Sequence, residues 1–252
     1  MQLSELVAFL DDFMHKSDFT DALPIGQLVE GRPEVRKVAT AVTANAETME
    51  RAAEWGADLL LVHHGMFWDN ADRVVRGHLK RRLKCLLDRD MSLVGYHLPL
   101  DAHEEVGNNI LFARAMGLRD VEPFGLYHGK KIGWKGRLEP ALGPGEFVAR
   151  ARAYYGREPM AAFLAGPEKI ATVAVVSGGA WDHVAEAARE GCDCYVTGNA
   201  DEPSPSLARE EAIHFLAFGH YATERVGIRR LGEVVAERFG LDVRFVEVEN
   251  RL

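Results

Sequence analysis

The sequence predicts an α/β protein with largely parallel sheets. Two observations lead to this class: short apolar runs of β-forming residues alternate with longer amphipathic stretches, and several runs are apolar throughout. Continuous apolar runs are typical of parallel strands that are covered on both faces. The length of 252 residues, 47% of them hydrophobic and 27% charged, allows one large domain or two modest ones with real cores.

The alternation begins at the first residue. Leucines and other apolar residues recur at helical spacing over residues 1–14, with acidic residues between them, which predicts an amphipathic helix and not a secretion signal. In the first half, strands are expected at 38–42, 59–62 and 93–96, and helices at 46–55, 76–88 and 108–116, the last ending near Gly117.

Composition changes over residues 121–145, which contain six glycines and three prolines. Such a stretch indicates a hinge or a domain boundary, so we expect one lobe at 1–124 and a second at 125–252. In the second half, helices are expected at 146–155, 182–190 and 222–239, and strands at 172–176, 194–197, 214–218 and 243–248.

The net charge indicates which partners the protein does not attract, and the cysteine content indicates its compartment. The formal net charge of −8 argues against a general attraction to nucleic acid or anionic lipid. No run approaches the roughly 18 apolar residues that a membrane helix needs. Cys85, Cys192 and Cys194 form a sparse, odd set that suits a reducing compartment, so a cytoplasmic location is expected.

The first motif with metal-ligand side chains is LLLVHHG, in which His63 and His64 follow a buried strand. Successive side chains of a regular strand point to opposite faces, so paired histidines cannot share a site in mid-strand. At the end of a strand, where Gly65 frees the backbone, they can flank a site wide enough for two ions. A single histidine here would more often be structural, but the adjacent pair favours ligands.

The second motif, GYHLPLDAHEEVGNN, also follows a strand and places His97, Asp101 and His103 within seven residues. We expect Pro99 to keep this segment extended. Asp101 is the strongest ligand candidate, because a carboxylate can bind one ion or bridge two. The alternative for Asp101 is a turn or a helix cap. The two histidines could be ligands, acid–base groups or outer partners that orient the ligands.

The third motif, FGHYATERVG, follows the strand expected at 214–218. His220 and Glu224 are four residues apart at the start of a helix, so their side chains share one face. The same spacing is common in ordinary surface charge pairs, and only its position after a glycine at a strand end strengthens it.

Together the three motifs supply five good candidates, His63, His64, Asp101, His220 and Glu224. A catalytic zinc normally uses three protein ligands and a structural zinc four, so five candidates with two carboxylates suit a pair of ions. The mixed donor set is compatible with zinc, iron, manganese, cobalt or nickel.

Three further features of the sequence each allow a functional and a structural interpretation. The turn at Ser177, Gly178 and Gly179 could hold a phosphate on its backbone N–H groups or could simply connect a strand to a helix. Cys192 and Cys194 fit core positions better than a zinc cluster, which would need a second pair. Phe67 and Trp68 could form the wall of a pocket for a flat ring, or could pack into the core.

At these motifs the sequence resembles the Nif-three-like family, often labelled GTP cyclohydrolase I type-two homologues. VHHGMFW, GYHLPLDAHEEVGNN and GHYATERVGIRRL occur in order at matching separations, and the likeness covers nearly the whole chain. The resemblance implies a two-lobed α/β subunit with layered sheets flanked by helices, and a toroidal homohexamer. It also implies a dinuclear centre whose ligands are those five residues, with His97 beside it as a catalytic or outer residue.

Two positions depart from the family pattern. Family members commonly read NGLQVEG where this chain reads IGQLVEG, so Ile25 replaces an asparagine and Gln27 and Leu28 stand in the reverse order. Asn199 stands where members commonly have glutamate. A substrate contact near either position is expected to differ.

These observations lead to a first hypothesis of a metal-dependent hydrolase acting on a small polar or nucleotide-like substrate. The alternatives are a non-catalytic metal-binding regulator or scaffold, and a di-iron oxidase.

Overall fold

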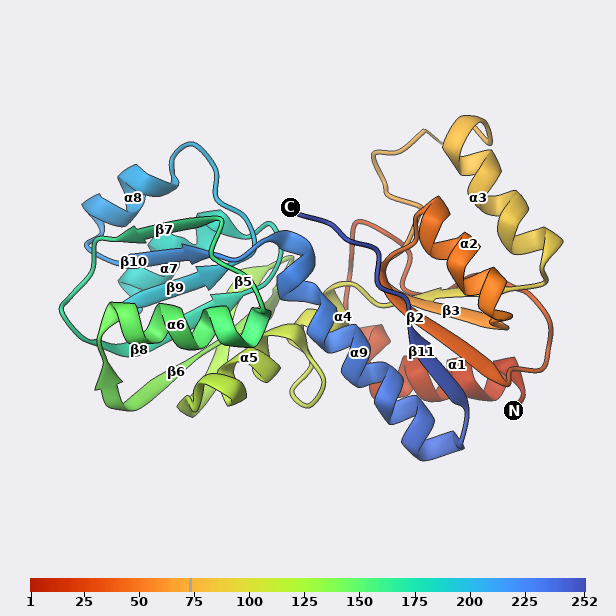
Figure 1. The fold of residues 1–252 in the computed structure, drawn as a ribbon, viewed down its shortest axis with the longest axis horizontal. Helices are drawn as coiled ribbons and strands as arrows, with labels where there is room; N and C mark the ends of the chain where they lie inside the picture. The colour runs from red at the N-terminus through yellow and green to blue at the C-terminus, as the bar shows by residue number, and fades with distance from the viewer. Residues whose placement is uncertain (73) are drawn as a thin grey trace. The chain divides into compact units, whose positions relative to one another are not determined.

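A computed structural model of the chain describes residues 1–72 and 74–252. The chain divides into two compact units, here called the first and the second unit. The first comprises Met1–Leu100 and Gly227–Glu249, and the second Asp101–Val226 and Asn250–Leu252. Each unit contains one sheet flanked by helices (Figure 1), so the predicted α/β class is confirmed.

The sheet of the first unit has the strand order β1-β4-β3-β2-β11. Four of its strands are parallel, and only β1 runs antiparallel, beside β4. The strands are β1 (Gly26–Val29), β2 (Lys37–Thr43), β3 (Leu59–His64), β4 (Ser92–Gly95) and β11 (Asp242–Phe245). The helical segments that lie wholly within this unit are α1 (Leu3–Phe13), η1 (Lys16–Asp18), α2 (Ala46–Trp55) and α3 (Gly77–Asp88).

Local signals account for α2, which begins and ends where the sequence predicts. Asn45 precedes it and its side chain accepts a hydrogen bond from the backbone N–H of Thr48, while Gly56 ends it with a left-handed φ of 80°. The buried face of α2, including Met49 and Ala52, packs with α3 over the apolar side chains of β2, β3 and β4. This packing fixes the end of β3, where the paired histidines lie.

The sheet of the second unit has the order β5-β6-β8-β9-β10-β7, with β8, β9 and β10 parallel and the outer strands antiparallel. The strands are β5 (Arg119–Tyr127), β6 (Lys130–Leu142), β7 (Ala161–Leu164), β8 (Ile170–Val176), β9 (Cys194–Thr197) and β10 (His214–Ala217). The helical segments are α5 (Asn108–Met116), α6 (Pro144–Tyr155), η2 (Trp181–His183), α7 (Val184–Arg189) and α8 (Ser204–Glu210). Two helices, α4 (Leu98–Ala102) and α9 (His220–Phe239), contain residues of both units.

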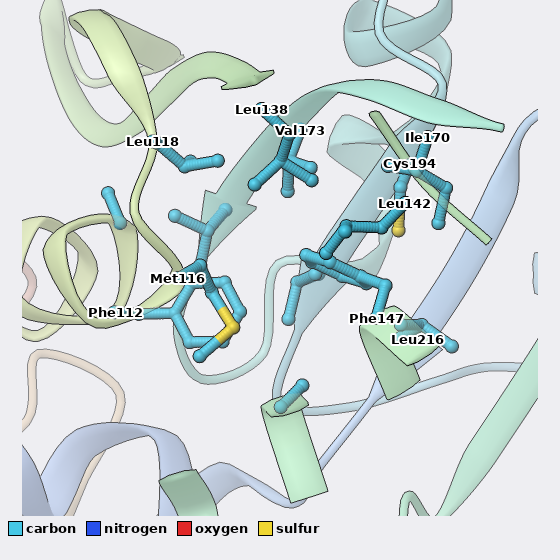
Figure 2. Packing of buried hydrophobic residues seen from close by; sticks show 14 of the residues in the cluster. Phe112, Met116, Leu118, Leu138, Leu142, Phe147, Ile170, Val173, Cys194 and Leu216 are labelled. Atoms are coloured by element: carbon cyan, nitrogen blue, oxygen red, sulfur yellow. The ribbon is translucent and has the colours of Figure 1, made fainter. Parts of the chain in front are cut away.

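The core of the second unit lies between the sheet and the helices α5 and α6. Figure 2 shows Phe112 and Met116 of α5 and Phe147 of α6 in one cluster with Val173 of β8 and Leu216 of β10. The helices α7 and α8 contact β9, β10 and β7. The parallel strands are therefore covered by helices, as their continuous apolar sequences predict.

The structure places the division of the chain elsewhere than the expected residue 124. The glycine-rich stretch forms the hairpin of β5 and β6, and Asp101 belongs to the second unit. A side chain at Gly133 would collide with the backbone oxygen of Val175 in β8, so this glycine permits close approach of two strands. Gly133 thus serves strand packing and not a hinge.

The segment after β4 also differs from expectation. Pro99 does not keep it extended, because residues Leu98–Ala102 form the short helix α4. Proline is tolerated in the first turn of a helix, where its missing N–H would have no intrahelical partner. Within residues 1–72 and 74–252, no helix combines the length and apolar character that crossing a membrane requires.

Candidate metal centre

The paired histidines are the last two residues of β3, so the strand continues two residues beyond its expected end. His64 pairs in register with Thr43 of β2. Both histidines are buried, and their ring centroids lie 4.5 Å apart although neighbouring strand positions normally face opposite sides. The strand end therefore gathers two imidazoles within one small region of the first unit.

His97, which follows β4, brings a third imidazole to this region. Its ring centroid lies 5.1 Å from that of His63 and 5.4 Å from that of His64. One ring nitrogen from each of the three histidines lies within 4.8 Å of the others. The adjacent parallel strands β3 and β4 thus place their carboxyl-terminal side chains together, as open α/β sheets commonly do at ligand sites.

Each of these imidazoles has a hydrogen-bond partner at Nδ1. The partner is the backbone oxygen of Tyr96 for His63, at 3.1 Å, and the hydroxyl of Thr43 for His64, at 3.2 Å. For His97 it is the carboxylate of Asp21, at 2.9 Å. Metal-binding histidines are usually held in this way, with one ring nitrogen fixed by the protein and the other presented to the ion.

In the second unit, Asp101 in α4 is held by two side chains. Its Oδ1 accepts hydrogen bonds from Nδ2 of Asn108 and from the hydroxyl of Ser177, both at 2.8 Å. Asn109 completes this arrangement, because its Oδ1 accepts from the N–H of Ser177. Asp101 is buried and lies within α4, where Asn108 and Ser177 hold its carboxylate.

His220 and Glu224 occupy the first two turns of α9 and share one face, as their spacing predicts. Nε2 of His220 lies 3.2 Å from Oε1 of Glu224. The Glu224 side chain is only 3% exposed, so this is not the ordinary surface pair that the same spacing often makes. A side chain at Gly178, whose φ is +68°, would collide with Oε1 of Glu224. Glycine is therefore required where the turn after β8 meets α9.

The charges of Asp101 and Glu224 favour a bound cation between or beside their carboxylates. Carboxylate oxygens of Asp101 and Glu224 lie within 4.8 Å of one another, and both residues are buried. Two negative charges in such an environment repel each other unless a positive charge compensates them. The oxygen and imidazole donors present in this unit therefore fit a divalent ion.

Asp21 is a buried carboxylate beside His97. Burial raises the pKa of Asp21. The hydrogen bond and charge of His97, together with the hydrogen bonds from the N–H groups of Leu98 and Ala22, lower it by more, so the pKa of Asp21 lies below its usual value. Its ionised form is thereby favoured.

Two other candidates from the sequence, His103 and the turn after β8, make contacts within the protein. Nδ1 of His103 faces the backbone N–H groups of Glu105 and Val106, which is a turn contact. The N–H of Ser177 is occupied by Asn109 and that of Gly178 by the hydroxyl of Thr223. Two of the three backbone N–H groups of this turn are thus engaged within the protein, which favours the tight connection over a phosphate cradle.

Cys192 and Cys194 are buried, as a core position requires. Burial raises the pKa of the Cys192 thiol to about 12, and that of Cys194 is raised as well. With such a pKa, only about one Cys192 in ten thousand is thiolate at pH 8. We expect neither thiol to be alkylated by iodoacetamide at pH 8 in the native protein over minutes, whereas both react in urea. Rapid native modification of Cys192, located by mass spectrometry, would contradict this assignment.

Sequence reasoning did not identify Asp21, Thr43, Asn108 or Asn109. The two asparagines adjoin the second motif and could have been found as a buried polar pair beside Asp101. Asp21 carries no local signal, because it lies 76 residues before His97.

The fold and these side chains define a class: a protein of two α/β units with imidazole and carboxylate donors at the carboxyl ends of parallel strands. The sequence model of the family Duf34/NIF3 (NGG1p interacting factor 3) matches residues 1–251. This chain belongs to that family, and the predicted family is confirmed.

Relatives and solved structures agree with this assignment. The chain is 40% identical over 251 residues to a "GTP cyclohydrolase 1 type 2 homolog" of Chlamydia trachomatis, covering 99% of both chains. It is 40% identical over 248 residues to the protein of that name from Pseudomonas aeruginosa, covering 98% of both. The solved structure of protein ybgI, whose function is described as unknown, has a TM-score of 0.93 at 38% identity, with full coverage of both chains. A structure from Thermus thermophilus has a TM-score of 0.91 at 34% identity, also with full coverage.

Proposed function

We propose that this protein is a metal-dependent hydrolase in which His63, His64, Asp101, His220 and Glu224 bind two divalent ions. The observation that carries the proposal is the pair of buried carboxylates, Asp101 and Glu224, which calls for positive charge. The close imidazoles of His63 and His64 supply neutral donors of the kind that zinc, iron, manganese, cobalt and nickel accept. Asp101 and Glu224 would supply the carboxylate donors to these ions, and His63, His64 and His220 would supply the imidazole donors.

Paired divalent ions, when bound, lower the pKa of a water molecule and polarise a substrate oxygen. The chain's own residues supply the rest. His97 takes up a proton at its imidazole as water attacks an electrophilic carbon or phosphorus atom, and returns the proton to the leaving group. Asn108 and Ser177 hold the Asp101 carboxylate in one orientation. Because this carboxylate does not have to reorient during the reaction, little free energy is spent on reorganising the site.

The substrate class that we propose is nucleotide-like, with a flat ring. A cavity of about 640 Å³ in the first unit is lined by residues 66–69, 71–72 and 74–79, and by Pro24. Its lining is mostly apolar, and its size suits a small organic ligand. Trp68 forms one side of this cavity, and its ring also lies 5.4 Å from that of His97. A ring placed against Trp68 would therefore lie close to the candidate catalytic histidine. The relatives' names, which refer to a GTP cyclohydrolase, support the same class.

Replacing Trp68 with Ala is expected to raise KM for a ring-bearing substrate about fivefold, because an aromatic contact contributes about 1 kcal/mol beyond area burial. Metal content should be unchanged. Trp68→Phe should retain most of the affinity. Trp55, which contacts Lys37 and Arg244 and does not line the cavity, gives the control Trp55→Ala. An equal rise of KM in both alanine variants would remove the cavity from the proposal.

Assembly and location complete the proposal. We expect a homohexamer, with a mass in light scattering of six times the 28.0 kDa chain, and a cytoplasmic location that keeps the three cysteines reduced.

The hydrolase proposal is tested by turnover of nucleotides and related heterocycles with protein loaded separately with zinc, manganese, cobalt, nickel or iron. Hydrolysis by the wild type and its loss in His64→Ala support the proposal. Metal binding without turnover of any substrate would favour a scaffold or regulator. A visible absorption band in protein purified without added metal, together with oxygen consumption, would favour a di-iron oxidase.

A further inference from the structure

Asp21 lies between η1 and β1, and its side chain is 1% exposed. Its two carboxylate oxygens lie 2.9 and 3.1 Å from Nδ1 of His97. The same carboxylate accepts the backbone N–H of Leu98 at 3.0 Å and that of Ala22 at 2.7 Å. Asp21 is therefore fixed by its own backbone and by the residue after His97, so it cannot turn away from the imidazole.

A carboxylate only accepts hydrogen bonds, so the contact with His97 requires a proton on Nδ1. A neutral imidazole protonated at Nδ1 carries its lone pair at Nε2. The lowered pKa of Asp21, which results from the balance described above, keeps the carboxylate ionised and able to accept. The ring of His97 is also held laterally by Trp68 and by the rings of His63 and His64.

We propose that Asp21 is the positioning residue of His97: it holds the imidazole as the Nδ1–H tautomer and thereby makes Nε2 the nitrogen that accepts a proton from the attacking water. The role of His97 rests on the proposed hydrolase function, whereas the tautomer rests on the contacts of Asp21 alone. In a serine hydrolase triad, a buried aspartate fixes its histidine by the same chemistry.

The neighbouring residue provides a matched control. The hydroxyl of Tyr96 donates to Asp11 at 2.6 Å, and Asp11 also accepts from Lys16 at 2.8 Å. This carboxylate holds the residue next to His97 in the chain but does not contact its imidazole. Asp11→Asn therefore perturbs the same segment without altering the partner of Nδ1.

The test is ¹⁵N NMR of the full-length protein labelled at histidine and loaded with zinc, recorded above about pH 8, where an ordinary imidazole is neutral. His97→Gln identifies the His97 signals. The wild type is expected to show Nδ1 as the protonated nitrogen and Nε2 as the unprotonated one. In Asp21→Asn an NH₂ group replaces one of the two oxygens, which accept separately from Ala22 and Leu98 and both lie near Nδ1. The single remaining oxygen is a weaker acceptor for Nδ1–H, so the Nε2–H tautomer of His97 is expected to gain population.

Asp11→Asn should leave the tautomer of His97 unchanged. If a substrate is turned over, kcat should fall by about 10²–10⁴-fold in Asp21→Asn, with zinc content retained, because the wrong nitrogen is protonated. A wild-type His97 protonated at Nε2 would overturn the proposal, even if the variant failed to fold. An unchanged tautomer in folded Asp21→Asn would overturn it as well. Absence of turnover in the wild type would instead count against the hydrolase function and leave the tautomer measurement decisive for Asp21.

Discussion

Replacing His64 with Ala is expected to remove bound metal and hydrolysis together. His64 lies at the end of β3, with Thr43 at its Nδ1 and the ring of His63 4.5 Å away, so the substitution removes one of the imidazoles gathered at this strand end. Loss of an outer partner of a ligand already costs about 10–100-fold in metal affinity, and loss of a ligand should cost more than about 100-fold. Metal retained per chain, measured by mass spectrometry after desalting, checks this result.

His128 provides the control for His64→Ala, because it is exposed in the turn between β5 and β6 of the second unit. His128→Ala should keep both metal and activity. Hydrolysis that persisted in His64→Ala after its metal was lost would refute the metal-dependent mechanism.

Replacing Gly178 with Ala is expected to have the second largest effect. The substitution places a methyl group against Oε1 of Glu224 at a φ of +68°, so the carboxylate must move from its buried position. The backbone conformation alone costs about 1–2 kcal/mol. Displacement of Glu224 adds the loss of a proposed ligand, and we expect metal affinity to fall by at least about 100-fold.

Gly191 separates the two effects. Its φ is +74°, and a side chain there would meet nothing within 4 Å. Gly191→Ala should therefore show the backbone cost in urea unfolding while it retains full metal binding. Equal loss of metal in the two variants would indicate that Gly178 acts through stability and not through Glu224.

The sequence predicts most of this fold because its local signals agree with its packing. The helix α2 has both an asparagine cap and a terminal glycine, and its predicted ends match the structure. The strands β8, β9 and β10 are recognisable because most of their residues are apolar and buried. Exposed strands are harder to recognise. In the hairpin, β5 is mostly exposed and β6 mixes exposed and buried residues without a regular period, and both contain glycines, so their composition resembles that of a loop.

The candidate site was predictable to the extent that its residues follow strands in recognisable motifs. Spacing placed His220 and Glu224 on one helix face, and the structure confirms that geometry. Sequence could not reveal Asp21, which reaches His97 from a distant segment, or the need for glycine at position 178, which arises from the approach of a turn to α9. Contacts between segments far apart in the chain depend on the tertiary fold and leave no periodic pattern.

The central claim is that this chain holds two divalent ions. It is tested most directly by metal stoichiometry in the full-length protein, purified without chelators or added metal and then also reconstituted with each candidate ion. We predict close to two ions per chain, falling in His64→Ala but not in His128→Ala. A value near zero in every preparation, or one that His64→Ala leaves unchanged, would contradict the account.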